Sequence, residues 1–210
     1  AGALHDLSEL FDLRLVAMQG GTARNAIPRE AAALFALPVT DAALLQSWVH
    51  EQHEIWREWF AESDDNVQLL CRLDAAHVRQ AIAHTDRDRL FDFLDAAANG
   101  VARMSDDFPG VVDTSDNLGV LGLEQGAFHA TFKVRSQHDE RADQLAGELV
   151  AHSASCSLHA WKDGAYPGWM PNPQSPLLAL CQRVYSAQYG RPASLQVIHA
   201  GLECGLLAAS

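Results

Sequence analysis

The chain has 210 residues, and 48% of them are hydrophobic, which is enough for a sizeable globular core. Fifteen basic residues against 27 acidic ones give a net charge of -12, and no stretch gathers basic with aromatic side chains, so we exclude a nucleic-acid-binding surface. The longest uncharged apolar runs fall well short of the roughly 20 residues that cross a bilayer, so we expect no membrane association.

The N-terminal stretch AGALHDLSELFDLRL has neither the basic segment nor the unbroken apolar core of a signal peptide. The cysteines are widely spaced and form no CxxC pair, which argues against a zinc knuckle or a redox dithiol and for reduced thiols. They are Cys71, Cys156, Cys181 and Cys204. We therefore expect a cytoplasmic protein.

The first half of the chain is predicted to mix helices with short strands. Residues 1–10 are typical of the last turns of a helix, residues 11–19 alternate as a strand does, and Gly20-Gly21 indicates a turn. The apolar run 29–38 is bounded by prolines and too short for an independent helix, so it is predicted to be a buried strand. Further along we predict a helix over 41–60 capped by Thr40 and Asp41, a strand over 66–73, and helices that begin at Asp74 and Asp86, the second ending at Asn99-Gly100.

The second half is predicted to contain most of the antiparallel sheet. After a strand over 101–105, residues 115–124 and 127–137 form a hairpin across a Gln125-Gly126 turn. A helix over 138–154 and a strand over 155–161 follow. This order predicts an α+β fold, an open and mostly antiparallel sheet with helices on one face.

The composition changes after this sheet. Four prolines fall within residues 162–176, which indicates a linker. Beyond it we predict a helix over 176–190, a strand over 193–198, a glycine turn and the start of another helix. This short α/β segment is typical of a different architecture.

One helix carries a pair of histidines that could touch a metal ion. His50 and His53 stand three residues apart with Glu51 between them, whereas the zincin pattern places the histidines four apart. The alternative is a solvated helix face, and the tryptophans on the same helix fit core or interface positions.

The C-terminal stretch GLECG has the outline of a turn that presents a nucleophile. Its central residue is Glu203, however, and Cys204 would need a base such as His199 and a lowered pKa to act as a nucleophile. The alternative is a ligand-binding turn, since Gly201 and Gly205 expose backbone at the end of a strand and the start of a helix.

Two sets of residues could bind a carboxylate. Arg24, Asn25 and Arg29 lie on a connection that begins with Gly20-Gly21, and Arg135 ends an otherwise apolar strand. Surface salt bridges in an acidic protein are the alternative for each arginine.

Several separate blocks of the chain resemble one enzyme family, in order and with matching spacing. The blocks are DLRLVAMQGGTARNAIPREA, NGVARMSDDFPGVVDTSDNLGV, VRS, KDGAYPGWMPNPQSPLL and VIHAGLECGLL. Together they closely resemble the aminoacyl-histidine dipeptidases, also called Xaa-His or cytosol non-specific dipeptidases, of the carnosinase and aminoacylase metallopeptidase superfamily. The resemblance implies a catalytic domain interrupted by a lid that also forms the homodimer. Residues 1–165 would then be the lid and dimerisation domain, and residues 166–210 a partial return into the catalytic domain.

The resemblance also implies roles for individual residues. Asn25 and Arg135 would hold the substrate, with Arg135 on its terminal carboxylate, and Gly201 would line the pocket beside His199 and Glu203. The family's metal ligands and general base match no residue of this segment, so two divalent ions, zinc with manganese or cobalt as the alternatives, would be bound elsewhere in a longer parent enzyme. The chain is thus expected to be an internal piece without activity of its own.

The function implied for the parent is hydrolysis of dipeptides with a C-terminal histidine, of the carnosine type, by a metal-activated water. Two alternatives stay open. One is a catalytically silent dimerisation or interaction module, and the other is a hydrolase with Cys204 as its nucleophile.

Overall fold

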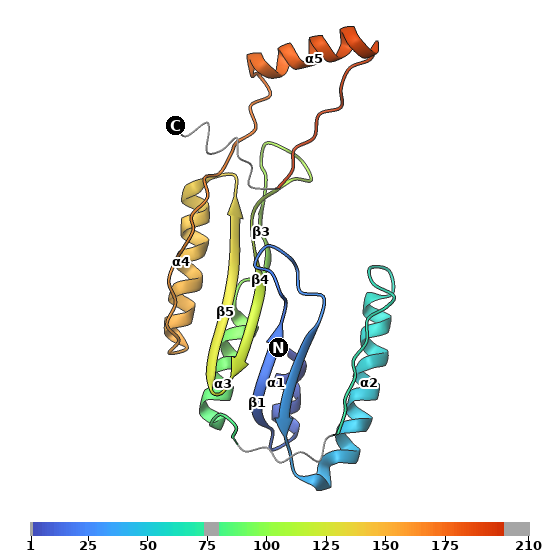
Figure 1. Ribbon diagram of the computed structural model, residues 1–210, viewed down its shortest axis with the longest axis vertical. Helices are drawn as coiled ribbons and strands as arrows, with labels where there is room; N and C mark the ends of the chain where they lie inside the picture. Colours follow the sequence, from blue (N-terminus) through green and yellow to red (C-terminus); the bar gives the residue numbers. More distant parts are fainter. Residues whose placement is uncertain (1, 74–79, 200–210) are drawn as a thin grey trace. The chain divides into compact units, whose positions relative to one another are not determined.

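The computed structural model describes residues 2–73 and 80–199 of the chain (Figure 1). Within these ranges it contains five α-helices, one 3₁₀ turn and five strands. They are α1 (Gly2–Leu10), β1 (Arg14–Gly20), β2 (Ala31–Ala36), η1 (Val39–Asp41), α2 (Ala42–Phe60), α3 (His84–Ala96), β3 (Gly100–Met104), β4 (Val112–Glu124), β5 (Ala127–Ser136), α4 (Asp139–Ser155) and α5 (Pro176–Tyr189). The predicted α+β class with an open antiparallel sheet is confirmed.

The sheet is built around β4, the longest strand. In the order β2-β1-β4-β3, all neighbours are antiparallel, and β5 pairs with β4 along its other side. One part of β4 pairs with β1, from Gly20↔Leu121 to Met18↔Leu123, and the part near its start pairs with β3. The long strand β4 therefore joins β3 to the β1–β2 pair within one sheet.

The chain divides into two compact units. Unit 1 comprises Ala1–Gly20, Arg29–Asp95 and Leu121–His129, and unit 2 comprises Gly21–Pro28, Ala96–Val120 and Ala130–Ser210. Both β4 and β5 continue from one unit into the other. Each unit is described by itself below.

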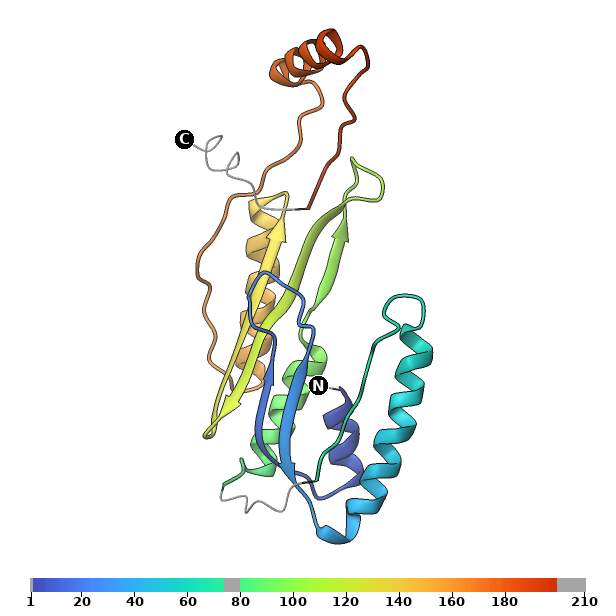
Figure 2. The same ribbon diagram turned by 45° about the vertical axis from the view of Figure 1, so that its right-hand side comes forward.

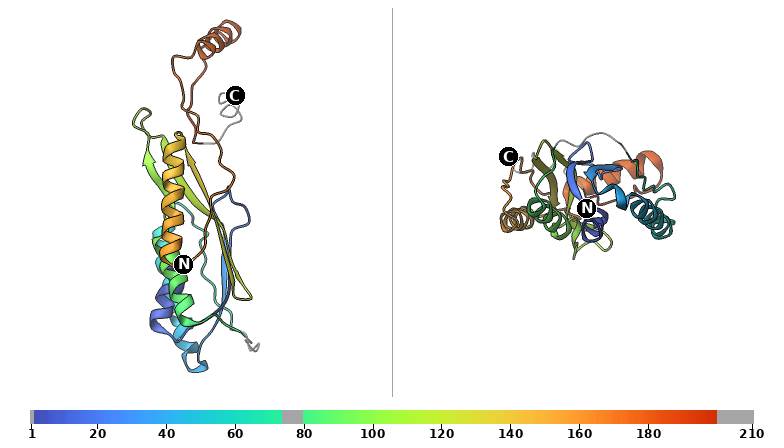
Figure 3. Two further views of the ribbon diagram at one scale, coloured as in Figure 1. Left: turned by 90° about the vertical axis from the view of Figure 1, so that its left-hand side faces the viewer. Right: turned by 90° about the horizontal axis from the view of Figure 1, so that it is seen from below.

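Unit 1 holds the main hydrophobic core. Helices α1 and α3 cover one face of its strands (Figure 3). The buried cluster consists of Leu7, Leu13, Leu15, Met18, Leu45, Leu90, Phe91 and Leu123. The side chain of Arg87, on α3, is 7% exposed and donates from Nη1 to the carbonyl of Leu13 at 2.6 Å. This bond fixes α3 to the turn that precedes β1.

Unit 2 places α4 against the β4–β5 ladder, with Leu145 and Leu149 buried on the inner side of the helix. After α4 the chain runs back along the helix as an extended segment (Figure 2). Lys162 bonds Asp143, and the backbone N–H of Gly168 donates to the carboxylate of Asp139 at 2.6 Å. The segment after α4 thus has fixed anchors although it contains no strand.

The turns and helix ends explain why several predictions are confirmed. Gln125 and Gly126 have φ of 52° and 80°, the left-handed pair that a two-residue hairpin turn requires. Gly190 ends α5 with φ of 68° after Pro176 has opened the helix, as expected for these residue types. The prediction for α4 is also confirmed.

Three predicted strands are wrong. The described residues 66–73, 155–161 and 193–198 form no strand, although each has the composition of one. Apolar alternation measures only the tendency to bury one side, and a strand also needs a neighbour with free hydrogen-bonding groups. In 66–73, for example, the N–H of Leu69 donates to Nδ1 of His53, on α2, rather than to a strand.

Two helix starts also differ from the prediction. Helix α3 begins at His84, so Asp86 lies in its first turn, and it ends at Ala96, before Asn99-Gly100. Asp41 does occupy the position before α2, but its side chain makes no capping bond because the 3₁₀ turn η1 leads into the helix. The helix predicted to begin at Asp74 lies outside the described residues.

Candidate functional site

In unit 2 the loop 21–28 lies directly on β4. A Cβ atom added to Gly119, in β4, would come within 2.6 Å of Cα and O of Arg24. Gly21 opens the loop with φ of +68°, and a Cβ there would overlap the carbonyl of Gly119. Glycine at position 119 is therefore what allows the loop backbone to contact the strand.

Asn117 connects this loop with Arg135. Its Nδ2 lies 3.4 Å from the carbonyl of Arg24 and 3.2 Å from that of Ala26, so it bonds the loop on both sides of Asn25. Its Oδ1 accepts from Nη1 of Arg135 at 3.4 Å. Two residues predicted to hold a substrate, Asn25 and Arg135, are thus brought together through a third.

His199 joins the same group from the far end of the chain. Its Nε2 lies 2.7 Å from Oγ of Ser115, two residues before Asn117 on β4. Burial, and then the positive charge of Arg135, lowers the pKa of His199, although Asp113 and the backbone of Val112 act in the opposite direction. The imidazole is therefore neutral at pH 7 and available as a hydrogen-bonding group.

The site carries positive charge in an acidic protein. Burial and the neighbouring charges of Arg135 and Arg24 lower the pKa of Lys133. In the described part of the structure, none of the ion pairs formed by acidic groups involves Arg24, Lys133 or Arg135. Among the described residues, therefore, neither Arg24 nor Arg135 forms the surface salt bridge that was the alternative for each. Such a group of cations favours an anionic ligand.

Only some of the predicted site residues lie in the described part of the chain. Three of them lie in unit 2, namely Asn25 on its exposed loop, Arg135 and His199. Arg29 belongs to unit 1. The predicted positions Gly201, Glu203 and Cys204 lie outside the described residues. These positions stay predictions.

Sequence reasoning missed Ser115, Asn117 and Gly119. They are the first, third and fifth residues of the stretch SDNLG in β4, and alternate residues of a strand share one face. A glycine inside a strand often marks the close approach of another backbone, so this signal was present in the sequence. Which backbone approaches could be learned only from the tertiary structure.

No three of the His, Cys, Asp and Glu side chains in residues 2–73 and 80–199 are grouped so that they could hold a metal ion. The solvated helix face, the alternative for the histidine pair on α2, describes His50 but not His53, because His50 is exposed whereas His53 is partly buried and its Nδ1 accepts a hydrogen bond from the N–H of Leu69. The chemistry that these described residues offer is recognition of an anion and placement of a polar ligand.

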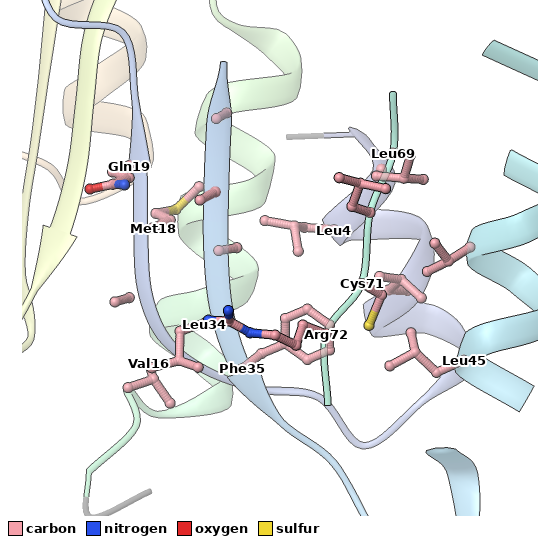
Figure 4. A pocket seen from close by; sticks show the side chains of 18 of the residues that line it. Leu4, Val16, Met18, Gln19, Leu34, Phe35, Leu45, Leu69, Cys71 and Arg72 are labelled. Atoms are coloured by element: carbon pink, nitrogen blue, oxygen red, sulfur yellow. The ribbon is translucent and has the colours of Figure 1, made fainter. Parts of the chain in front are cut away.

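Unit 1 contains a separate, mainly apolar groove with a volume of about 2370 Å³. The stretch with Leu69, Cys71 and Arg72 runs between β2 and α2 along this groove (Figure 4). Partial burial raises the pKa of the Cys71 thiol, which disfavours the thiolate, although the residue as a whole is exposed. Arg29 also lines this groove. The lining also includes five carboxylates, those of Asp6, Glu30, Asp64, Asp86 and Glu124.

Comparison with known proteins identifies relatives of the whole chain. No family model matches. A curated protein, the cytosol non-specific dipeptidase of Escherichia coli (strain K12), is 38% identical over 200 residues, which are 95% of this chain and 41% of that protein. A crystal structure of aminoacylhistidine dipeptidase from Vibrio alginolyticus aligns with a TM-score of 0.83 and 35% identity, over 96% of this chain and 41% of that one.

The chain is homologous to part of the aminoacylhistidine dipeptidases. The predicted resemblance is thereby confirmed, and the match to the Vibrio alginolyticus dipeptidase extends it to the fold. The chain spans about 41% of the length of each dipeptidase it matches. Among the helices of the described residues, none is both long and apolar enough to cross a membrane.

Proposed function

We propose that this chain is the lid and substrate-binding portion of a dipeptidase that hydrolyses dipeptides with a C-terminal histidine. Its homology to the aminoacylhistidine dipeptidases supports the reaction class. Residues 1–165 act as the lid and dimerisation domain and residues 166–210 as part of the catalytic domain. A cytoplasmic location agrees with the name of the Escherichia coli relative, a cytosol non-specific dipeptidase.

One observation carries the substrate-binding role. The guanidinium of Arg135 is oriented by Asn117, and no acidic side chain of the described residues pairs with it. A fixed guanidinium without a counter-ion suits the terminal carboxylate of a dipeptide, which it can bind through two parallel hydrogen bonds. Asn25, on the loop that Asn117 bonds at Arg24 and Ala26, supplies an amide for the substrate backbone.

His199 adds a neutral imidazole on the same side of β4. Because its pKa is lowered, it can exchange hydrogen bonds with a polar substrate atom without repelling Arg135. Gly201 and Glu203 complete this pocket in the proposal. The chain itself thus binds and orients the dipeptide, a contribution that can amount to roughly 7–11 kcal/mol of the barrier in favourable cases.

Two divalent ions, zinc with manganese or cobalt as the alternatives, belong to the proposed enzyme and are held by residues outside this chain. The described residues do not fit such a centre, since they offer no group of three possible ligands. When bound, paired ions of this kind activate water and polarise a carbonyl. We therefore expect the 210-residue chain alone to be inactive.

The test is an assay of the full-length protein that carries this chain, with β-alanyl-histidine and added zinc or manganese. Hydrolysis that a chelator abolishes and that thiol alkylation leaves intact supports the proposal. No hydrolysis with any metal would overturn it. Loss of activity on alkylation of Cys204, with no effect of chelators, would instead support a thiol hydrolase.

The role of Arg135 is tested with two substrates in the same protein. Arg135→Ala is expected to lower kcat/KM for the free dipeptide far more than for its C-terminal amide, because only the free acid carries the carboxylate. An equal loss for both substrates would contradict the assigned role.

A second candidate function, a dimerisation module, is favoured by exposed apolar side chains in unit 1. Strand β2 is an edge of the sheet, and Leu34 on it is 51% exposed, while Trp59 on α2 is 75% exposed. Edges and apolar faces of this kind are typical subunit contacts. Sedimentation over a range of concentrations tests it, with Trp59→Ser as the variant that should weaken association. A wild-type chain that stays monomeric at high concentration would exclude this role.

A further inference from the structure

We propose that Asn117 is a positioning residue that couples Asn25 to Arg135 and so sets the preference for a free terminal carboxylate. The inference rests on the proposed function for its consequence in catalysis. Its structural part, that Asn117 holds the loop 21–28 in place, stands on the hydrogen bonds alone.

The orientation of the Asn117 amide follows from its partners. Two backbone carbonyls, those of Arg24 and Ala26, face one end of the amide, and the guanidinium of Arg135 faces the other. Carbonyls only accept hydrogen bonds and a guanidinium only donates them. The donor end must therefore point to the loop and the acceptor end to Arg135.

No other common side chain of this size can serve both partners. Aspartate would keep the acceptor for Arg135 but would face the loop carbonyls with a second acceptor. Its charge would also pair with Arg135 and compete with the carboxylate of a substrate. Alanine would leave both the loop and Arg135 without this partner.

Gly119 makes the loop dependent on this one side chain. The loop backbone at Arg24 contacts β4 where Gly119 has no side chain, and both Arg24 and Asn25 are exposed to solvent. Among the described residues, the hydrogen bonds of this loop are the turn bond from the N–H of Ala26 to the carbonyl of Ala23 and the two bonds from Asn117. Removing that amide should loosen the loop around Asn25.

The first measurement needs no enzymatic activity. Arg24 is a trypsin site within the loop, so its rate of cleavage, followed by mass spectrometry in the full-length protein, reports how often the loop opens. Asn117→Ala is expected to raise this rate several-fold. The matched control is Asn99→Ala, because Asn99 also bonds β4, through the N–H of Leu118 at 3.0 Å, but does not touch the loop.

The second measurement compares β-alanyl-histidine with its C-terminal amide in the metal-loaded full-length protein. Asn117→Ala is expected to lower kcat/KM for the free acid about tenfold, mainly through KM, while the amide changes by about twofold or less. Asn117→Asp should lower the free-acid value further. In an Arg135→Ala background the effect of Asn117→Ala should largely disappear, as expected for residues that act together.

The outcomes separate the two proposals. Faster cleavage at Arg24 with lost preference for the free acid supports the coupling. Unchanged cleavage, or equal losses for both substrates, overturns it, and so does the same loss in Asn99→Ala. A wild-type protein that cleaves no dipeptide would refute the proposed function, while faster proteolysis in Asn117→Ala would still support the structural part. If Asn117→Ala unfolds, Asn117→Asp is compared in the same two measurements.

Discussion

Oγ of Ser115 and Nε2 of His199 lie 2.7 Å apart, joining two residues that are 84 positions apart in the chain. Ser115 is fixed by the ladder of β4, whereas His199 follows a stretch without a helix or strand. The bond therefore attaches the last described residues of the chain to the sheet of unit 2, and it does so beside Arg135, whose charge acts on the imidazole.

The first prediction concerns the protonation of His199. Arg135→Gln removes a positive charge that lowers the pKa of this imidazole, so the pKa is expected to rise. Burial, the largest cause of the lowered pKa, remains in this variant. NMR titration of the imidazole measures it. Arg24→Gln is the control, since the charge of Arg24 acts on Lys133. A His199 pKa that does not rise in Arg135→Gln would contradict the assignment.

The second prediction concerns the contact between the loop and β4. Gly119→Ala puts a methyl group 2.6 Å from the backbone of Arg24, which must then move. We expect the free energy of unfolding to fall by about 1–3 kcal/mol, the usual cost of overpacking. Gly20→Ala is the matched control, because the nearest atom to a Cβ there is 3.4 Å away. Urea unfolding measures the free energy of unfolding of both variants. Equal losses in Gly119→Ala and Gly20→Ala would show that the contact between Gly119 and Arg24 is not tight.

The third prediction concerns the buried carboxylate of Asp113, which is 1% exposed. It pairs with Arg141 on α4, accepts from Oγ of Ser136 at 3.2 Å, and lies 3.6 Å from Nε of Arg103. Asp113→Ala leaves these groups without their common partner, but both arginines are partly exposed and Arg103 keeps Asp106, so we expect a loss of about 1–3 kcal/mol in unfolding free energy. In contrast, Asp143→Ala removes an exposed pair and should cost about 1 kcal/mol or less. Similar losses in both variants would contradict the central role of Asp113.

The fourth prediction concerns pH and Asp116. This side chain is 4% exposed and its Oδ2 has no hydrogen-bond partner in the described structure. Burial raises its pKa, against opposing backbone hydrogen bonds, so the folded state binds this proton more tightly than the unfolded state does. Ionisation of Asp116 thus costs stability at pH values above the folded pKa. The cost shrinks as the pH falls and is absent below the unfolded value of about 3.9.

Asp116→Asn is therefore expected to stabilise the protein at pH 7 and to lose this advantage toward pH 4. The control is Asp106→Asn, because the hydrogen bond from Arg103 lowers the pKa of Asp106 and the change should have the opposite sign. Thermal unfolding across this pH range gives both results. A stability difference for Asp116→Asn that does not vary with pH would contradict the prediction.

The parts of the fold that could be predicted from the sequence depend on local chemistry. The Gln125-Gly126 turn, the proline and glycine at the ends of α5, and the amphipathic pattern of α4 each act over a few residues. The three wrong strands had suitable side chains, but a strand also needs a partner in space. Residues 66–73 pass between β2 and α2 instead, and no pattern within eight residues encodes that path.

The candidate site was predicted in part, and mainly through family resemblance. The residue types of Asn25 and Arg135 indicated anion binding, and the structure brings them together. Asn117 could not be assigned this way, because its role depends on the meeting of a loop and a strand about 90 residues apart. A single asparagine in a sequence does not indicate a particular role. The role of Asn117 follows only from its hydrogen bonds to the carbonyls on either side of Asn25.

The two-residue turn between β4 and β5 also has a consequence for the order of folding. Closing a short loop costs little chain entropy, whereas β1 and β4 come together only after about a hundred residues are looped out. The β4–β5 hairpin and the pairing of β3 with β4 across the short loop 105–111 are therefore expected to form early, and β1 to add later to the free side of β4. Since β4 and β5 run through both compact units, neither unit can complete its sheet until this one hairpin exists.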